Sequence, residues 1–157
     1  MNIEFSRTAK VECDKIIAKY PEKRAAMLPI LYLAEKEFGH ISGEVEKYVG
    51  KLLDVPPVKV HEVLTFYTLI AAKPRGKYHF QVCRGLSCDL KGCVKVIDYL
   101  SEVLKIHPDA TSEDLMYTLT PVECLAACET APMMQLNEDY HGNLTKEKID
   151  GILKESK

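Results

Sequence analysis

The chain has 157 residues, of which 46% are hydrophobic and 28% charged, and its formal net charge is −2 at pH 7. This balance is typical of an ordinary globular protein with one domain or two small ones, and the small net charge argues against binding to nucleic acid or anionic lipid. No apolar run approaches the roughly 18 residues of a membrane span, and the N-terminal residues lack the pattern of a secretory signal. We therefore expect a cytoplasmic protein without direct membrane insertion.

The first 72 residues repeat the 3.6-residue periodicity of amphipathic helices. Gly39 fits the C-cap of the second expected helix, and Ser42 fits the N-cap of the third. Pro29 predicts either a kink in the second helix or a later start. The pattern predicts a small helical bundle. Its expected helices span 5–19, 24–38, 42–53 and 57–68.

The last two of these helices could also form a helix-turn-helix that reads DNA. The second of them carries only Lys59 and His61 as potential cations, beside Glu62. Phosphate contacts need more positive charge than this. A docking and scaffolding bundle is the interpretation that the charges favour.

A linker at 71–76, with Pro74 and Gly76, separates this bundle from a second region. Beyond it strands and helices alternate in the order β, α, β, β, α, which predicts a mixed sheet flanked by helices and an α+β protein. The predicted domains are 1–72 and 73–157. The expected elements of the second domain are strands at 78–82, 116–122 and 133–137, a helix at 90–104 and a last helix after Thr145.

Four of the six cysteines form two close pairs after predicted strands. Cys83 and Cys88 stand in CRGLSC, and Cys124 and Cys128 stand in CLAAC. Thiolates are the usual ligands of iron-sulfur irons, and two loops with two thiolates each suit a cluster of two irons and two sulfides. We predict that each pair binds one iron, from loops that leave backbone N–H groups free to face the cluster.

Other uses of these cysteines are open at this point. A structural zinc site tolerates such spacing, although shorter C-x2-C pairs are more usual. A thioredoxin-type redox centre needs C-x-x-C, and disulfides need a secreted chain. Cys93 extends the spacing to C-x4-C-x4-C and is an alternative iron ligand, although its helical pattern favours a place in the core. Cys13 is expected to face the core, and His79 is expected to be at most an outer contact of the cluster.

The chain resembles one family from about residue 24 to residue 152. The resemblance is carried by GKYHFQVC, which ends at Cys83, by CLAAC followed by Ala131-Pro132, and by LPILYLAEKEFGHIS and VPPVKVHEVLTFYTLI in the helical part. These stretches resemble the thioredoxin-like 2Fe-2S subunit of the NADH-dehydrogenase module of respiratory complex I. Relatives of that subunit occur in NAD-linked, often electron-bifurcating, hydrogenases and in NAD-dependent formate dehydrogenases.

The resemblance implies a helical N-terminal region and a thioredoxin-like domain in which Cys83, Cys88, Cys124 and Cys128 bind a 2Fe-2S cluster. It also implies docking on a flavoprotein subunit that binds FMN and NAD(H), beside further iron-sulfur subunits. This chain has no glycine-rich dinucleotide motif of its own. Ala126 departs from the family, where Gly is common, and its methyl group is expected to tilt the second loop or exclude a hydrogen bond.

The expected function is therefore one-electron transfer within an NAD-linked oxidoreductase complex, which reaches a membrane only through its other subunits. Quinone, protons, ferredoxin and CO2 or formate all stay open as the terminal partner of that complex. Two other functions also stay open: a free-standing thioredoxin-like ferredoxin and a zinc-stabilised interaction module.

Overall fold

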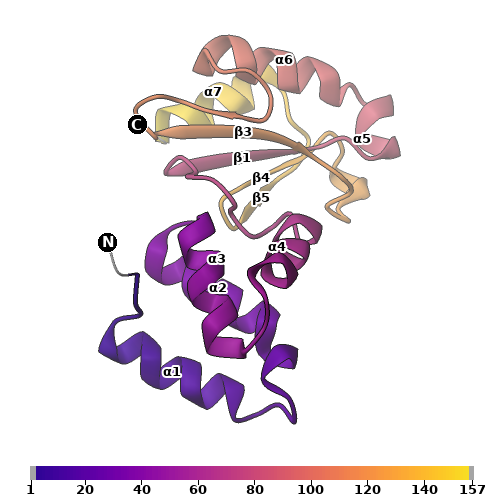
Figure 1. The fold of residues 1–157 in the computed structure, drawn as a ribbon. Coiled ribbons are helices and arrows are strands. Elements are labelled where there is room, and N and C mark those ends of the chain that lie inside the picture. The colour runs from indigo at the N-terminus through magenta and orange to yellow at the C-terminus, as the bar shows by residue number, and fades with distance from the viewer. Residues whose placement is uncertain (1–2, 156–157) are drawn as a thin grey trace. The chain divides into compact units, whose positions relative to one another are not determined.

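The computed structural model describes residues 3–155 and divides the chain into two compact units, 1–74 and 75–157. Each unit has its own hydrophobic core. Figure 1 shows that the first unit is helical and that the second is built on a sheet. The predicted α+β class is confirmed. Within the described residues, no helix is long and apolar enough to cross a membrane.

The helices of the first unit begin where the sequence supplies caps. Ser6 Oγ accepts a hydrogen bond from the Ala9 amide at 3.2 Å, and Ser42 Oγ accepts one from the Val45 amide at 3.4 Å. Pro57 is the first residue of its helix, a position where the missing N–H has no intrahelical partner to lose. The elements are α1 (Arg7–Ile17), the 3-10 helix η1 (Lys23–Ala26), α2 (Met27–Phe38), α3 (Gly43–Leu53) and α4 (Pro57–Phe66).

Helix α2 starts later than its periodicity predicts. It begins at Met27 rather than at residue 24, so Pro29 lies in its first turn. Backbone N–H groups in a first turn have no intrahelical acceptor, and a proline there costs no hydrogen bond. The later start is therefore the correct one of the two predicted outcomes. The helix ends as predicted at Gly39, whose φ of 79° is the left-handed conformation that glycine adopts easily.

Aromatic and aliphatic side chains fill the interior of the first unit. The rings of Phe5 and Phe38 stack with their centroids 5.5 Å apart, and Tyr48 packs edge-on against Phe5 at 5.2 Å. Cys13 is 1% exposed in this core, which confirms its predicted place. The largest fully buried side chains here are Ile30, Leu31, Ile41, Val45, Val49 and Leu53.

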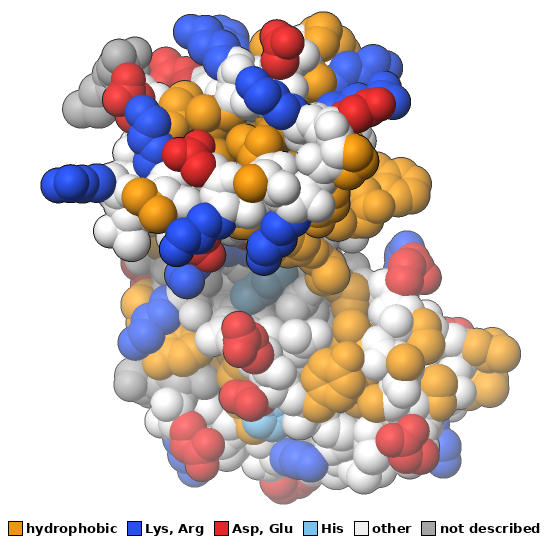
Figure 2. All heavy atoms as spheres, turned by 90° about the horizontal axis from the view of Figure 1, so that it is seen from below, with side chains coloured by type: hydrophobic (Ala, Val, Ile, Leu, Met, Phe, Trp, Pro, Cys, Tyr) orange, Lys and Arg blue, Asp and Glu red, His pale blue; other side chains and the backbone are white. Residues whose placement is uncertain are grey.

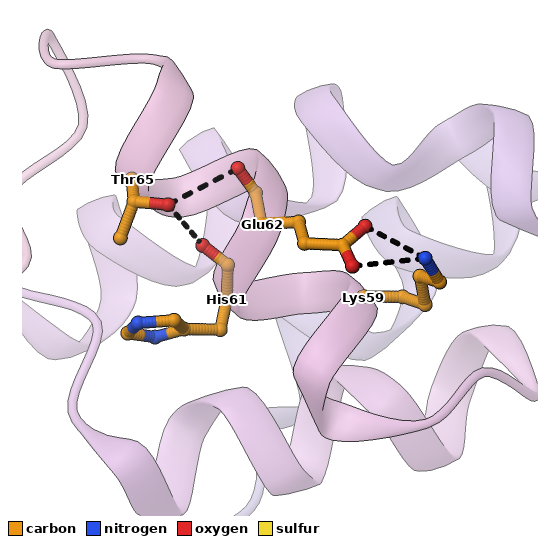
Figure 3. Close-up of polar contacts among 4 residues, drawn as sticks. All are labelled: Lys59, His61, Glu62 and Thr65. Carbon is orange, nitrogen blue, oxygen red and sulfur yellow. Dashed lines mark hydrogen bonds and ion pairs between the residues drawn. The ribbon is translucent and has the colours of Figure 1, made fainter.

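On the exposed face of α4, Lys59 and His61 both lie beside carboxylates. Lys59 Nζ lies 2.9 Å from both carboxylate oxygens of Glu62 (Figure 3). His61 Nδ1 lies 3.1 Å from Glu46 Oε1, and Thr65 Oγ1 donates to the His61 carbonyl at 2.9 Å. Basic and acidic side chains are interspersed on the face drawn in Figure 2. Because a DNA-reading helix needs cations that reach phosphates, these pairs argue against the helix-turn-helix interpretation.

The second unit is a five-stranded mixed sheet in the order β2-β3-β1-β4-β5. Strands β1 and β3 are parallel, and the other neighbouring strands are antiparallel. Figure 1 shows α6 and α7 on the same side of this sheet. The elements are β1 (Tyr78–Cys83), α5 (Leu86–Leu90), α6 (Cys93–Leu104), β2 (Ala110–Thr111), β3 (Tyr117–Val122), the 3-10 helix η2 (Cys128–Thr130), β4 (Met134–Leu136), β5 (Asp139–His141) and α7 (Lys146–Glu155).

Three of these elements differ from the sequence-based expectation. The helix expected at 90–104 begins only at Cys93, because Gly92, with φ of 89°, interrupts the chain after a separate short helix, α5, that ends at Leu90. The structure also has strands β2 and β5, in segments for which the sequence predicts no strand. Both are only two or three residues long, and pairing with β3 and β4 rather than local propensity makes them strands.

His79 in β1 gives the stability of the chain a predicted pH dependence. Its Nε2 lies 2.9 Å from Thr120 Oγ1 on β3. Burial and, less strongly, the charge of Arg75 lower the pKa of His79 from 6.5 to about 4. As the pH falls, the unfolded chain therefore takes up this proton before the folded chain does. We expect the free energy of unfolding to decrease between about pH 6.5 and pH 4 and to level off below that range.

Denaturant unfolding across this range of pH measures the effect. His79→Gln keeps a polar side chain but takes up no proton, so it should flatten this part of the profile. Equal slopes in the variant and the wild type would contradict the assignment to His79.

Candidate metal centre

Parallel pairing of β1 and β3 brings the starts of the two cysteine segments to one edge of the sheet. Cys83 is the last residue of β1, and Val122, its partner in the register, is the last residue of β3. The ladder continues for one more bond, from the Arg84 amide to the Val122 carbonyl at 2.9 Å. Cys124 follows β3 by two residues. The topology thus places Cys83 and Cys124 at neighbouring carboxyl ends of parallel strands.

The first cysteine pair is buried. Cys83 is 3% exposed and Cys88 is 2% exposed. Cys83 ends strand β1 and Cys88 lies on the short helix α5, which corrects the expectation that both stand in a loop. Gly85 is the N-cap of α5, and this single helical turn brings Cys88 back toward Cys83. The Cys88 thiol interacts with the Cys83 thiol and with the backbone amide of Met133.

The second cysteine pair is exposed. Cys124 Sγ accepts a hydrogen bond from the Ala126 amide at 3.3 Å. Cys128 begins the 3-10 turn η2. The Tyr140 hydroxyl, from β5, donates to the Leu125 carbonyl between the two cysteines at 3.1 Å. This contact joins residues 15 positions apart, and the turn residues around Tyr140 give no local signal for it.

The two cysteine segments lie close together at Gly85. A Cβ at this position would lie 3.3 Å from Cys124 Cβ and 3.6 Å from Cys83 Sγ. The 3.3 Å separation is tighter than most real Cβ contacts, so a side chain at 85 would press on the second segment. Gly85 therefore lies where the segment of Cys83 meets the segment of Cys124, and the absence of a side chain permits this close approach.

Thiols on two neighbouring segments are the type of donor that a 2Fe-2S cluster requires. Burial raises the pKa of the Cys88 thiol, so a thiolate there depends on the positive charge of a bound metal. The Ala126 amide donates to Cys124 Sγ, and such a contact offsets the negative charge of a thiolate ligand. Within residues 3–155, no three side chains of His, Cys, Asp or Glu are arranged to hold a single metal ion.

The other two cysteines lie in the cores, as predicted. Cys13 belongs to the first unit, and Cys93 is 1% exposed as the first residue of α6. Burial raises the pKa of Cys93, and the nearby charges of Asp89 and Cys83 raise it further. Cys93 is therefore a neutral, buried thiol in the same core as Cys83 and Cys88.

Ala126 holds a backbone conformation that suits glycine. Its φ is 59°, in the left-handed region, yet its amide still donates to Cys124 Sγ. The methyl group of Ala126 therefore does not prevent this hydrogen bond.

We predict that Ala126→Gly relieves the left-handed strain of about 1–2 kcal/mol and loses part of this gain to the greater freedom of the unfolded chain. The expected net result is about 0.5–1 kcal/mol of added stability with the Cys124 hydrogen bond kept. Chemical denaturation under anaerobic conditions measures it. A destabilised variant would contradict the left-handed assignment.

Comparison with known proteins adds to this geometry. Residues 13–157 match the family model described as thioredoxin-like [2Fe-2S] ferredoxin. The chain is 42% identical over 146 residues to a subunit of the NADH-quinone oxidoreductase of Rhizobium meliloti (strain 1021), covering 93% of this chain and 87% of the relative. It is 38% identical over 157 residues to a subunit of the NADH-quinone oxidoreductase of Rickettsia felis (strain ATCC VR-1525 / URRWXCal2), covering 98% and 94%.

A solved structure shares the fold. The crystal structure of an NAD+-reducing [NiFe]-hydrogenase in the air-oxidized state superposes with a TM-score of 0.73 and 16% sequence identity, covering 83% of this chain. The chain spans only 22% of the length of that hydrogenase chain. At this identity the likeness concerns the fold alone. The family match agrees with the thioredoxin-like architecture and the 2Fe-2S cofactor expected from the sequence. The chain belongs to the family of thioredoxin-like [2Fe-2S] ferredoxins.

Proposed function

We propose that this chain is the 2Fe-2S electron-carrying subunit of an NADH-quinone oxidoreductase complex. The observation that carries the proposal is its 42% identity, over 93% of its length, to a subunit of such an enzyme. The hydrogenase likeness, at 16% identity, supports the fold and does not favour a hydrogenase. The chain thus contributes to an enzyme complex, and the substrate sites lie on other subunits.

Four cysteines are proposed as the cluster ligands. Cys83 and Cys88 would hold one iron, and Cys124 and Cys128 would hold the other. The adjacent strand ends, the close approach at Gly85 and the backbone N–H groups directed at sulfur support this assignment. When bound, such a cluster supplies one-electron oxidation and reduction. Rigid strand ends keep the ligand positions similar in both oxidation states, which favours fast electron transfer.

The proposed partner is a flavoprotein subunit that binds FMN and NAD(H). A nicotinamide gives up two electrons as a hydride, so a flavin is needed between it and a one-electron carrier. Large apolar side chains lie on the surface of both units: Phe66 is 77% exposed and Leu69 63% in the first, and Leu86 is 77% exposed and Leu90 78% in the second. Apolar side chains that group together on a surface mark contact sites, and Phe66 and Leu69 stand only three residues apart in the first unit. We propose docking as the role of residues 1–72.

The two alternative functions are less well supported. A free-standing ferredoxin does not need the N-terminal helices. The relatives from Rhizobium meliloti and Rickettsia felis match 93% and 98% of this chain, so the match includes its helical part. A structural zinc site needs four ligands around one ion, and the described residues hold no such group of three or more. Further iron-sulfur subunits in the same complex are part of the proposal.

Anaerobic purification of the full chain tests the cofactor. We expect two irons and two acid-labile sulfides for each chain, and an EPR signal that appears after reduction with dithionite. A colourless, EPR-silent protein with bound zinc would contradict the proposal. Coexpression with a candidate flavoprotein tests the partner, because NADH should reduce the cluster only when that subunit is present.

A further inference from the structure

Arg84 and Glu123 each stand next to a cysteine, one position beyond the paired strand ends Cys83 and Val122. Arg84 follows Cys83 directly, and Glu123 directly precedes Cys124. Arg84 Nε and Nη2 both donate to Glu123 Oε1, at 3.0 and 2.5 Å. The Arg84 amide also donates to the Val122 carbonyl, so the two charged side chains face each other as cross-strand neighbours at the sheet edge.

This ion pair is too exposed to contribute much to overall stability. The two side chains are 59% and 79% exposed, and such pairs have little effect on the free energy of unfolding. A guanidinium is protonated at any ordinary pH and a surface carboxylate is ionised at neutral pH, so the two side chains carry opposite charges. Any effect of the pair is therefore local, on the cysteines to which both residues are covalently joined.

We propose that Arg84 and Glu123 are positioning residues that clasp the two cysteine segments together and keep the charge beside the cluster balanced. The inference rests on the proposed 2Fe-2S site and names two residues that control it. Reduction of a cluster adds one negative charge. A lone guanidinium nearby would favour that charge and a lone carboxylate would oppose it, whereas the pair nearly cancels.

Midpoint potentials of the single variants test the balance of charge. The full chain is purified anaerobically, and the EPR signal is followed through a redox titration. We expect Arg84→Gln to lower the equilibrium constant for reduction about threefold and Glu123→Gln to raise it about threefold. Each change corresponds to about 28 mV at about 59 mV for every tenfold. The double variant R84Q/E123Q should return close to the wild-type potential.

Loss of iron to a chelator tests the clasp. Both single variants and R84Q/E123Q should lose iron about threefold faster than the wild type, because the segments no longer hold each other. The reversed pair R84E/E123R should restore slow loss. Arg24→Gln is the matched control, since Arg24 pairs with Glu22 at 2.9 Å on an equally exposed surface of the first unit. It should change neither the potential nor the rate.

The outcomes separate this inference from the proposed function. Potentials that move in the same direction in both single variants, or stay unchanged, overturn the inference, and so does unchanged iron loss. A wild-type chain that binds no iron and sulfide overturns the proposed function and this inference with it. That result is visible before any substitution is made.

Discussion

Cys124→Ser is expected to lower the amount of bound 2Fe-2S cluster at least about tenfold and to abolish or strongly alter the EPR signal of what remains. A hydroxyl is a harder and less readily ionised ligand than a thiolate, so it stabilises iron poorly in both oxidation states. Cys124 is exposed, so its replacement removes a ligand without opening a cavity in the core. Iron and sulfide analysis beside EPR of the dithionite-reduced chain measures both effects.

Two further cysteines serve as controls for this experiment. Cys13→Ser changes a thiol in the core of the first unit and should leave the EPR signal intact. Cys93→Ser is the more demanding control, because this thiol shares a core with Cys83 and Cys88. We expect some loss of stability and an unchanged signal. A normal signal in the Cys124 variant, or a lost signal in the Cys13 variant, would contradict the ligand assignment.

The helical unit could be predicted closely because its signals are local. Ser42 and Gly39 cap their helices where the sequence places them, and apolar residues recur at helical spacing. The short elements around the cluster site could not be predicted in the same way. Helix α5 is a single turn, too short to show a period, and β5 exists only because its backbone pairs with β4.

The site itself is predictable from sequence in composition but not in arrangement. The spacing of Cys83, Cys88, Cys124 and Cys128 indicates two pairs of thiolates, and nothing in that spacing states which strands are neighbours. Parallel pairing of β1 with β3 supplies the missing fact. Contacts such as the Tyr140 hydroxyl on the Leu125 carbonyl depend on strand order, so local sequence patterns carry no trace of them.

The turn that carries Cys128 packs directly against Gly142, so its position requires that residue 142 has no side chain. A Cβ on Gly142 would lie 2.3 Å from both Cβ and Oγ1 of Thr130 and 2.9 Å from its carbonyl oxygen. Thr130 belongs to η2, the turn that begins at Cys128, and its carbonyl accepts a hydrogen bond from the Asn143 amide. The side chain of Thr130 is β-branched and stiff, so it has little freedom to move aside.

Gly142→Ala is therefore expected to push η2 away from the sheet and to lower the free energy of unfolding by about 1–3 kcal/mol, as overpacked sites do. Faster loss of iron than in the wild type should accompany it, because η2 begins with a proposed ligand. Gly151→Ala is the matched control: its Cβ meets no atom within 4 Å, and it lies inside α7, where alanine should add about 0.5–1 kcal/mol of stability. Anaerobic denaturation and chelator assays on both variants measure these differences. Equal stability of the two variants would show that residue 142 does not support the turn that carries Cys128.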